Sequence, residues 1–142
     1  MDRRELIDFV RARGLGVIAS RGPDGSPQAA LVGIAATDEG EIVLDCSRGS
    51  RKYANIEHDP AVALVVGWDD EVTVQVEGSA QILGGADLER CKAAYFEQYP
   101  DGRDPGRITR DRPHRLDPAV AALLRLSARH LRQLRDAVLT VP

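Results

Sequence analysis

Apolar residues recur along the chain with two different spacings, and the change from one to the other separates helices from strands. At the start, an apolar side chain every three or four positions predicts an amphipathic helix over residues 2–13. Asp2 and Glu5 match a capping box at its beginning, and Gly14 stands where such a helix would end. The first element is therefore expected to be a helix with one face on a core.

Beyond Gly14, short apolar stretches alternate with turn residues, a pattern typical of antiparallel hairpins. The expected strands cover residues 16–20, 28–36, 41–46, 61–68 and 72–83. The first three are joined by the short turns 22–27 and 37–40, so they are expected to form an antiparallel meander.

The last two of these strands differ in pattern. Residues 61–68 are almost continuously apolar, which predicts a strand buried on both faces. Residues 72–78 alternate strictly, which predicts a half-buried strand, and Gly78 is expected to form a bulge or bend within it. Trp68 is expected to pack at the end of the barrel, or alternatively to lie in an interface.

The remaining segments comprise two expected helices, a loop and an ambiguous end. A short helix is expected after residue 50, and a longer one over residues 86–98. Residues 99–118 hold four prolines and five arginines, which predicts a long loop, either a solvated connection or a lid over a ligand. Residues 119–134 have helical propensity, but the chain can also be divided at 127–130 into two strands.

These elements predict a mainly β fold, a six- to seven-stranded antiparallel β-barrel with peripheral helices, because closure removes exposed sheet edges. A length of 142 residues suits a single domain over residues 1–142.

Composition excludes several classes of function. The chain is 43% hydrophobic and 29% charged with a net charge of −3, so no overall positive charge favours nucleic acid or an anionic membrane. No stretch is apolar enough to span a bilayer, and the first residues lack the apolar core of a secretion signal. The two cysteines form no CxxC pair, which indicates a reducing, cytoplasmic environment and no zinc site.

The chemistry is concentrated in Ser50, Arg51 and Lys52, which follow a strand and begin a helix. A helix N-terminus presents free N–H groups and partial positive charge, and adjacent arginine and lysine make phosphate a natural ligand. The alternative is a solvated basic helix start without a ligand.

The order of motifs around this turn carries a resemblance. Gly49 to Lys52, a helix ending in Asp59-Pro60, an apolar strand and then Thr73 to Gly78 resemble the pyridoxamine 5′-phosphate oxidase-like family of FMN-binding split barrels. Residues 25–32 also look like the second strand of that family. The resemblance covers residues 5–98 and favours strands, over residues 120–126 and 131–135, at the end of the chain.

The resemblance implies a binding site for FMN at the interface of a homodimer. It implies that the FMN phosphate is bound by Ser50, Arg51 and Lys52, and that the ribityl chain and ring edge lie along Asp45, Cys46 and Ser47. The isoalloxazine would be faced by Ala30, Leu31 and Val32. Polar contacts would come, from either subunit, from Thr73 and Gln75.

Some of these residues also have simpler interpretations. Thr73 and Gln75 can equally form the solvent face of a strand, and Cys46 fits a small buried residue. Asn55 fits a helix-face or capping group. The isolated histidines His58, His114 and His130 lack metal-ligand spacing, so no metal site is expected.

The resulting functional hypothesis is an FMN-dependent oxidoreductase that takes a small-molecule substrate and a reductant. The C-terminal Trp- and Arg-containing motif of true pyridoxamine phosphate oxidases is absent, since Trp68 is the only tryptophan, so a less specialised member is expected. The alternatives are a deazaflavin-dependent reductase on the same fold and a non-catalytic flavin- or haem-binding module.

Overall fold

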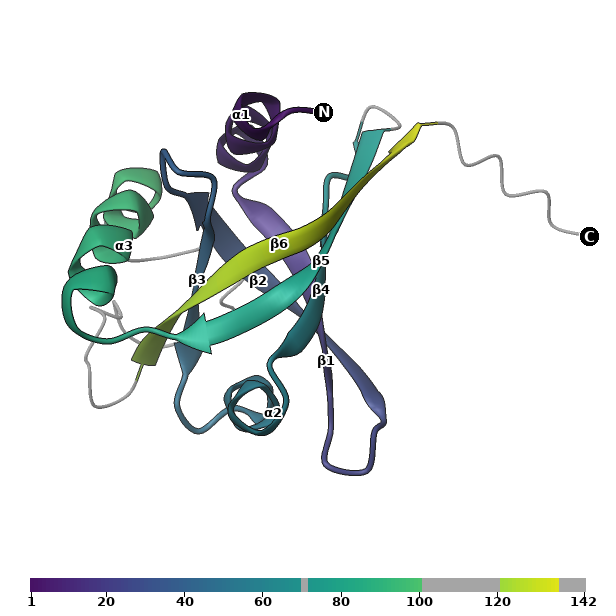
Figure 1. The fold of residues 1–142 in the computed structure, drawn as a ribbon, viewed down its shortest axis with the longest axis vertical. Helices are drawn as coiled ribbons and strands as arrows, with labels where there is room; N and C mark the ends of the chain where they lie inside the picture. The colour runs from purple at the N-terminus through teal and green to yellow at the C-terminus, as the bar shows by residue number, and fades with distance from the viewer. Residues whose placement is uncertain (70–71, 101–120, 136–142) are drawn as a thin grey trace, which may run out of the picture.

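Six antiparallel strands form a closed barrel in the computed structural model, which describes residues 1–69, 72–100 and 121–135 (Figure 1). The strands are β1 (Leu15–Arg21), β2 (Pro27–Ala36), β3 (Ile42–Ser47), β4 (Ala61–Val66), β5 (Val72–Ile82) and β6 (Ala121–Arg135). The helices are α1 (Arg3–Arg13), α2 (Arg51–His58) and α3 (Gly85–Gln98). The prediction of a mainly β barrel with peripheral helices is confirmed.

The strand order determines where α2 lies. Around the barrel the order is β1-β2-β3-β6-β5-β4, with β4 returning to β1, so two strands separate β3 from β4 in either direction. Helix α2 connects these two strands and therefore crosses one end of the barrel, opposite α1 in Figure 1. This crossing places the N-terminus of α2 beside the β1–β2 hairpin.

Local signals at the start of the chain fold as predicted. The Glu5 backbone N–H donates to the Asp2 carboxylate at 2.9 Å, and the Asp2 N–H donates to the Glu5 carboxylate at 2.7 Å. Gly14 ends α1 in the left-handed region with φ of 66°. Val10 is fully buried, so α1 closes its end of the barrel with its apolar face.

Strand β6 closes the barrel by pairing with both β3 and β5. The preference for strand over helix here is confirmed, but the predicted division at residues 127–130 is wrong, because β6 runs unbroken for 15 residues. The irregularity within it is a register shift at Glu77 and Gly78 of β5, where a bulge was predicted: Glu77 pairs with His130 and Gly78 with Ala128, so the extra residue of the bulge is Arg129 on β6. Cross-strand pairing on both sides overrides the helical propensity of the isolated segment.

The outer side of β4 differs from the prediction. Val62, Leu64 and Val66 are buried inside the barrel, whereas Ala63 and Val65 on the outer side remain partly exposed. The prediction of burial on both faces is therefore wrong for this chain by itself. Trp68, just beyond β4, is 53% exposed, so the expectation that it packs at the barrel end is also wrong.

Two predictions fall largely or partly on residues that the structure leaves undescribed. Of the expected loop over residues 99–118, only Tyr99 and Pro100 are described. Tyr99 is buried, and its hydroxyl donates to the Gly14 carbonyl oxygen, joining the end of α3 to the end of α1. His114 lies outside the described residues.

An ion-pair cluster attaches α3 to the barrel. Arg90 of α3 and Arg125 of β6 both donate to the Glu41 carboxylate, each with one nitrogen–oxygen distance of 3.0 Å. The hydrogen bonds from Arg90 outweigh partial desolvation and lower the pKa of Glu41 from its ordinary value of 4.5 to about 2.

Replacing Gly78 with alanine is expected to destabilise the fold by more than about 2 kcal/mol. A Cβ at this position would lie 2.1 Å from the Ser127 carbonyl oxygen, a backbone atom that cannot move without breaking the β5–β6 pairing. Chemical denaturation measures the change. Gly49→Ala is the matched control, because its Cβ would meet nothing within 4 Å, and equal stabilities for the two variants would contradict this account.

Glu41→Gln is expected to cost on the order of 2 kcal/mol at neutral pH and to flatten the acid limb of the stability curve. Because the pKa is lowered in the folded state, the stabilisation is present above pH 4.5 and is lost as the pH falls towards 2. Unfolding free energies of both proteins between those pH values test this. Parallel curves for wild type and variant would contradict it.

Candidate functional site

The turn before α2 is organised by Ser50, which is the N-cap residue. The Tyr53 backbone N–H donates to the Ser50 hydroxyl oxygen at 3.2 Å, and the Ser50 hydroxyl donates to the Ser47 carbonyl oxygen at 2.7 Å. The hydroxyl is therefore committed to the local turn. The backbone N–H groups at the start of the helix, which have no acceptor within the helix itself, are left to face a ligand.

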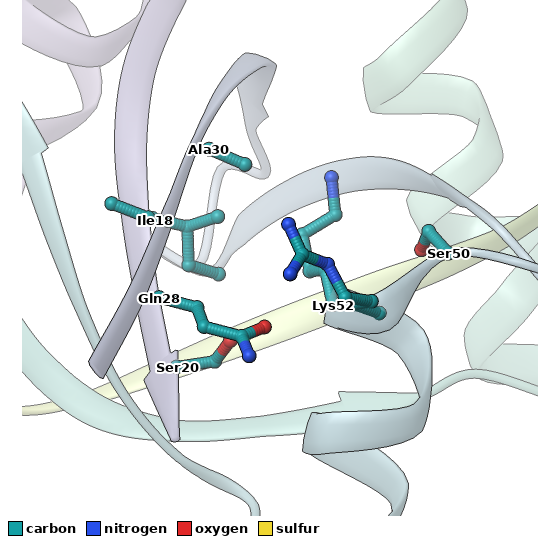
Figure 2. Close-up of a pocket in the computed structure, with 8 residues that line it drawn as sticks. Ile18, Ser20, Gln28, Ala30, Ser50 and Lys52 are labelled. Atoms are coloured by element: carbon teal, nitrogen blue, oxygen red, sulfur yellow. The ribbon is translucent and has the colours of Figure 1, made fainter. Parts of the chain in front are cut away.

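A pocket of about 180 Å³ lies between this helix start and the β1–β2 hairpin (Figure 2). It is lined by Ile18, Ser20, Gln28, Ala29, Ala30, Ser50, Arg51 and Lys52. Strands β1 and β2 thus supply one wall, and the turn and first residues of α2 supply the other. Figure 2 shows the side chains of Ser20 and Gln28 directed from the hairpin towards the helix that carries Lys52.

Two cations line this pocket without an anionic partner in the described part of the chain. Neither Arg51 nor Lys52 forms an ion pair with a described residue, although ion pairs hold many of the other cations of this acidic protein. Together with the helix N-terminus, they create a local positive field on a chain whose net charge is −3. This donor set fits the phosphate group that the sequence predicts.

Asn55 connects the two walls of the pocket. It lies one turn further along α2, is only 4% exposed, and its amide nitrogen donates to the Ser20 hydroxyl oxygen at 3.1 Å and to Gln28 Oε1 at 2.8 Å. The interpretation as a helix-face or capping group is therefore incomplete, because the side chain joins α2 to both strands of the hairpin.

The structure brings together four of the residues predicted for the site. Ser50, Arg51 and Lys52, predicted to bind the phosphate, line one pocket together with Ala30, which was predicted to face the isoalloxazine. The other two residues predicted from β2, Leu31 and Val32, do not line the pocket, and they lie on opposite sides of the strand because successive side chains of a strand alternate. Val32 is buried in the core, whereas Leu31 is 45% exposed on the outside of the barrel.

The residues predicted from β3 lie beneath the turn. Asp45 and Cys46 are buried at the end of β3, and the Cys46 sulfur lies 3.2 Å from the Ser50 hydroxyl oxygen. Cys46 is confirmed as a small buried residue. The Ser47 carbonyl oxygen accepts a hydrogen bond from the Ser50 hydroxyl, so the end of β3 stabilises the turn before α2.

Thr73 and Gln75 lie apart from the pocket of their own chain. On the barrel wall Gln75 pairs with Val65, Val65 with Val17, and Val17 with Leu31, so all four occupy one outer face. Three strand spacings, about 14 Å, separate β5 from β2 along this face. Within a single chain these two side chains do not join Arg51 and Lys52.

Sequence reasoning missed the hairpin wall. Ser20 and Gln28 line the pocket, yet neither was predicted as a site residue. One signal in the sequence could have indicated Ser20. In the alternation of β1 it lies on the same inward side as Ile18, and a polar residue at a buried position often has a specific role. Ser20 lies close to α2 only because α2 crosses the end of the barrel, and the residues next to Ser20 in the sequence do not reveal this.

The described residues also limit other functions. They contain no group of three or more histidine, cysteine or carboxylate side chains that could hold a metal ion. Among the helices that the structure describes, none has the length and apolar character needed to cross a membrane.

Comparisons with known proteins agree with the fold. The family model described as pyridoxamine 5′-phosphate oxidase matches residues 3–124. A pyridoxine/pyridoxamine 5′-phosphate oxidase from Rubrobacter xylanophilus is 38% identical over 91 residues, which cover 63% of this chain and 40% of that protein. The match thus spans well under half of the relative's length.

Two solved structures share the architecture. A conserved hypothetical protein from Mycobacterium tuberculosis superposes with a TM-score of 0.70 and 29% identity, over 100% of this chain and 89% of that one. An F420 reductase superposes with a TM-score of 0.65 and 22% identity, over 88% of this chain and 94% of that one. The second likeness shows the fold alone.

Proposed function

The chain belongs to the pyridoxamine 5′-phosphate oxidase family, and on this basis we propose that it is a flavin-dependent oxidoreductase that holds FMN by its phosphate at the start of α2. The observation that carries the proposal is the pair of cations, Arg51 and Lys52, lining a pocket without an anionic partner among the described residues. A phosphate dianion supplies the missing charge and accepts from both side chains and from the helix N–H groups.

The protein's part in such a reaction is binding and orientation. FMN, when bound, supplies the hydride and electron chemistry. Arg51 and Lys52 anchor one end of the cofactor, and Ser50 maintains the turn that presents them. Anchoring the phosphate fixes where the rest of the flavin lies relative to a small-molecule substrate.

A second copy of the chain completes the site in this proposal. The pocket of about 180 Å³ is smaller than the roughly 300–1,000 Å³ typical of cofactor and ligand sites, so it accommodates the phosphate end and leaves the ring system to other walls. Ala29 lines the pocket and lies on the same side of β2 as the exposed Leu31, so the pocket continues onto the outer face of the barrel.

This outer face has the composition of an interface. Leu31, Val17 and Val65 are cross-strand neighbours, and the exposed Trp68 follows β4 at one end of it. The apolar pattern on both sides of β4 is explained if a partner subunit covers this face. Thr73 and Gln75 lie on the same face, so in a homodimer they approach the partner's flavin.

A deazaflavin-dependent reductase is the second candidate, because the pocket selects for a phosphate and such cofactors also carry one. An F420 reductase has the same fold. The absorption spectrum of the cofactor-bound protein distinguishes the two, since FMN absorbs at longer wavelength than the deazaflavin.

Replacing Arg51 and Lys52 together by alanine is expected to weaken FMN binding by about 100-fold or more, because two charge-assisted contacts are lost. Quenching of flavin fluorescence measures the affinity. The control removes the same charge elsewhere by replacing the exposed Arg3 and Arg4, and should bind FMN as the wild type does. Unchanged FMN affinity in the Arg51/Lys52 variant would refute the phosphate assignment.

Leu31→Asp is expected to convert a dimer into monomers and to lower FMN affinity at least tenfold, because a charge would be buried in the interface. Light scattering coupled to size exclusion gives the mass in solution. Ala93→Asp, on the exposed side of α3, is the control and should remain dimeric. A wild-type protein that is monomeric while saturated with FMN would rule out the shared site.

A further inference from the structure

The hairpin wall of the pocket carries two polar side chains to which the proposed function gives no role. Ser20 lies on β1 and is only 7% exposed, and Gln28 lies on β2 directly after Pro27. Both line the same pocket as Arg51 and Lys52, from the opposite side. The Ser20 oxygen already accepts from Asn55, so it is the hydroxyl hydrogen that a polar ligand in the pocket could use.

Asn55 determines which hydrogen-bonding groups the wall can offer. A side-chain amide nitrogen has two hydrogens, and Asn55 directs one to the Ser20 oxygen and the other to Gln28 Oε1. Ser20 and Gln28 therefore each use an oxygen to accept a hydrogen bond from Asn55. The Ser20 hydroxyl hydrogen and the Gln28 amide nitrogen remain, and neither donates to another residue in the described part of the chain.

The pocket consequently presents donors from both sides. Arg51 and Lys52 contribute charged donors from the helix, and Ser20 and Gln28 contribute neutral donors from the hairpin. None of the described residues that line the pocket is a carboxylate. A phosphate dianion has only acceptor oxygens, so it matches this arrangement, whereas a ligand that brings its own donors does not.

We propose that Ser20 and Gln28 bind the cofactor phosphate and that Asn55 is a positioning residue that keeps their donors directed at it. The inference rests on the proposed function, since the phosphate is that of the flavin. It adds a second wall to the phosphate site, which is contributed by the β1–β2 hairpin and held to α2 through one buried amide.

Gln28→Glu and Ser20→Ala test the two binding residues. Gln28→Glu keeps an oxygen that accepts from Asn55 but replaces the donor with negative charge, so FMN affinity should fall roughly 100-fold. Ser20→Ala removes one donor, and affinity should fall about tenfold. Flavin-fluorescence quenching gives the affinities, and thermal unfolding of ligand-free protein shows that each variant is folded.

The control for charge is Gln81→Glu. Gln81 is exposed near the end of β5, and its oxygen accepts from Arg125 as a carboxylate also would, so this variant should bind FMN like the wild type. If Gln28→Glu and Gln81→Glu bind FMN equally well, Gln28 does not contact the phosphate.

Asn55→Asp tests the positioning role. The introduced carboxylate accepts from Ser20 and Gln28, turns both donors away from the pocket, and should lower FMN affinity at least tenfold. The ³¹P resonance of the FMN that still binds should move towards that of free FMN. A residue that only stabilises the fold would lower the unfolding temperature and leave that resonance unchanged.

Failure of this inference is distinguishable from failure of the proposed function. If Ser20→Ala and Gln28→Glu bind FMN normally while the Arg51/Lys52 variant does not, the hairpin wall is not part of the site and the proposed function stands. If the wild type binds no FMN, both are wrong. If Asn55→Asp does not fold, the Ser20 and Gln28 variants decide the question alone.

Discussion

Closure of the barrel by β6 is the constraint on which the arrangement of the site depends. Because β6 pairs with β3 on one side and β5 on the other, β3 and β4 are held on opposite sides of the barrel. The short α2 must then cross the barrel end, and its N-terminus comes to lie against the β1–β2 hairpin. A change at the β5–β6 bulge, far from the pocket, therefore acts on the frame that positions the cations.

Within this frame, two kinds of interaction form the proposed anion site. Ser50 and Asn55 use their hydrogen bonds inside the protein, one to build the turn and the other to fasten α2 to the hairpin. Arg51 and Lys52 form no ion pair with a described residue, and their charges are left for a ligand. The local charge, rather than the net charge of −3, determines what this part of the protein attracts.

Much of the fold follows from local sequence signals, because capping boxes, short turns and strict alternation act over a few residues. The first helix and the three-strand meander are examples. The continuity of β6 and the partly exposed outer side of β4 depend on pairing and on partners distant in sequence, so the pattern alone predicted them incorrectly. A strand that is apolar on both faces indicates that both faces are buried, but not whether the residues that bury them belong to the same chain.

The site shows the same division. Ser50, Arg51 and Lys52 are adjacent in sequence and could be recognised from the chemistry of a basic helix start. Ser20 and Gln28 lie on a hairpin 22 or more residues earlier, and only the crossing of α2 brings them opposite. The sequence places Asn55 on the helix, but it does not predict where the side chain points, because two hydrogen bonds to β1 and β2 determine that direction.

A crystal structure of the protein with FMN tests the central claim most directly. The account predicts difference density for a phosphate between Arg51 and Lys52 on one side and Ser20 and Gln28 on the other, with the flavin ring extending onto the outer face of the barrel towards a second subunit. FMN bound elsewhere on the barrel, or with its phosphate away from the start of α2, would contradict it.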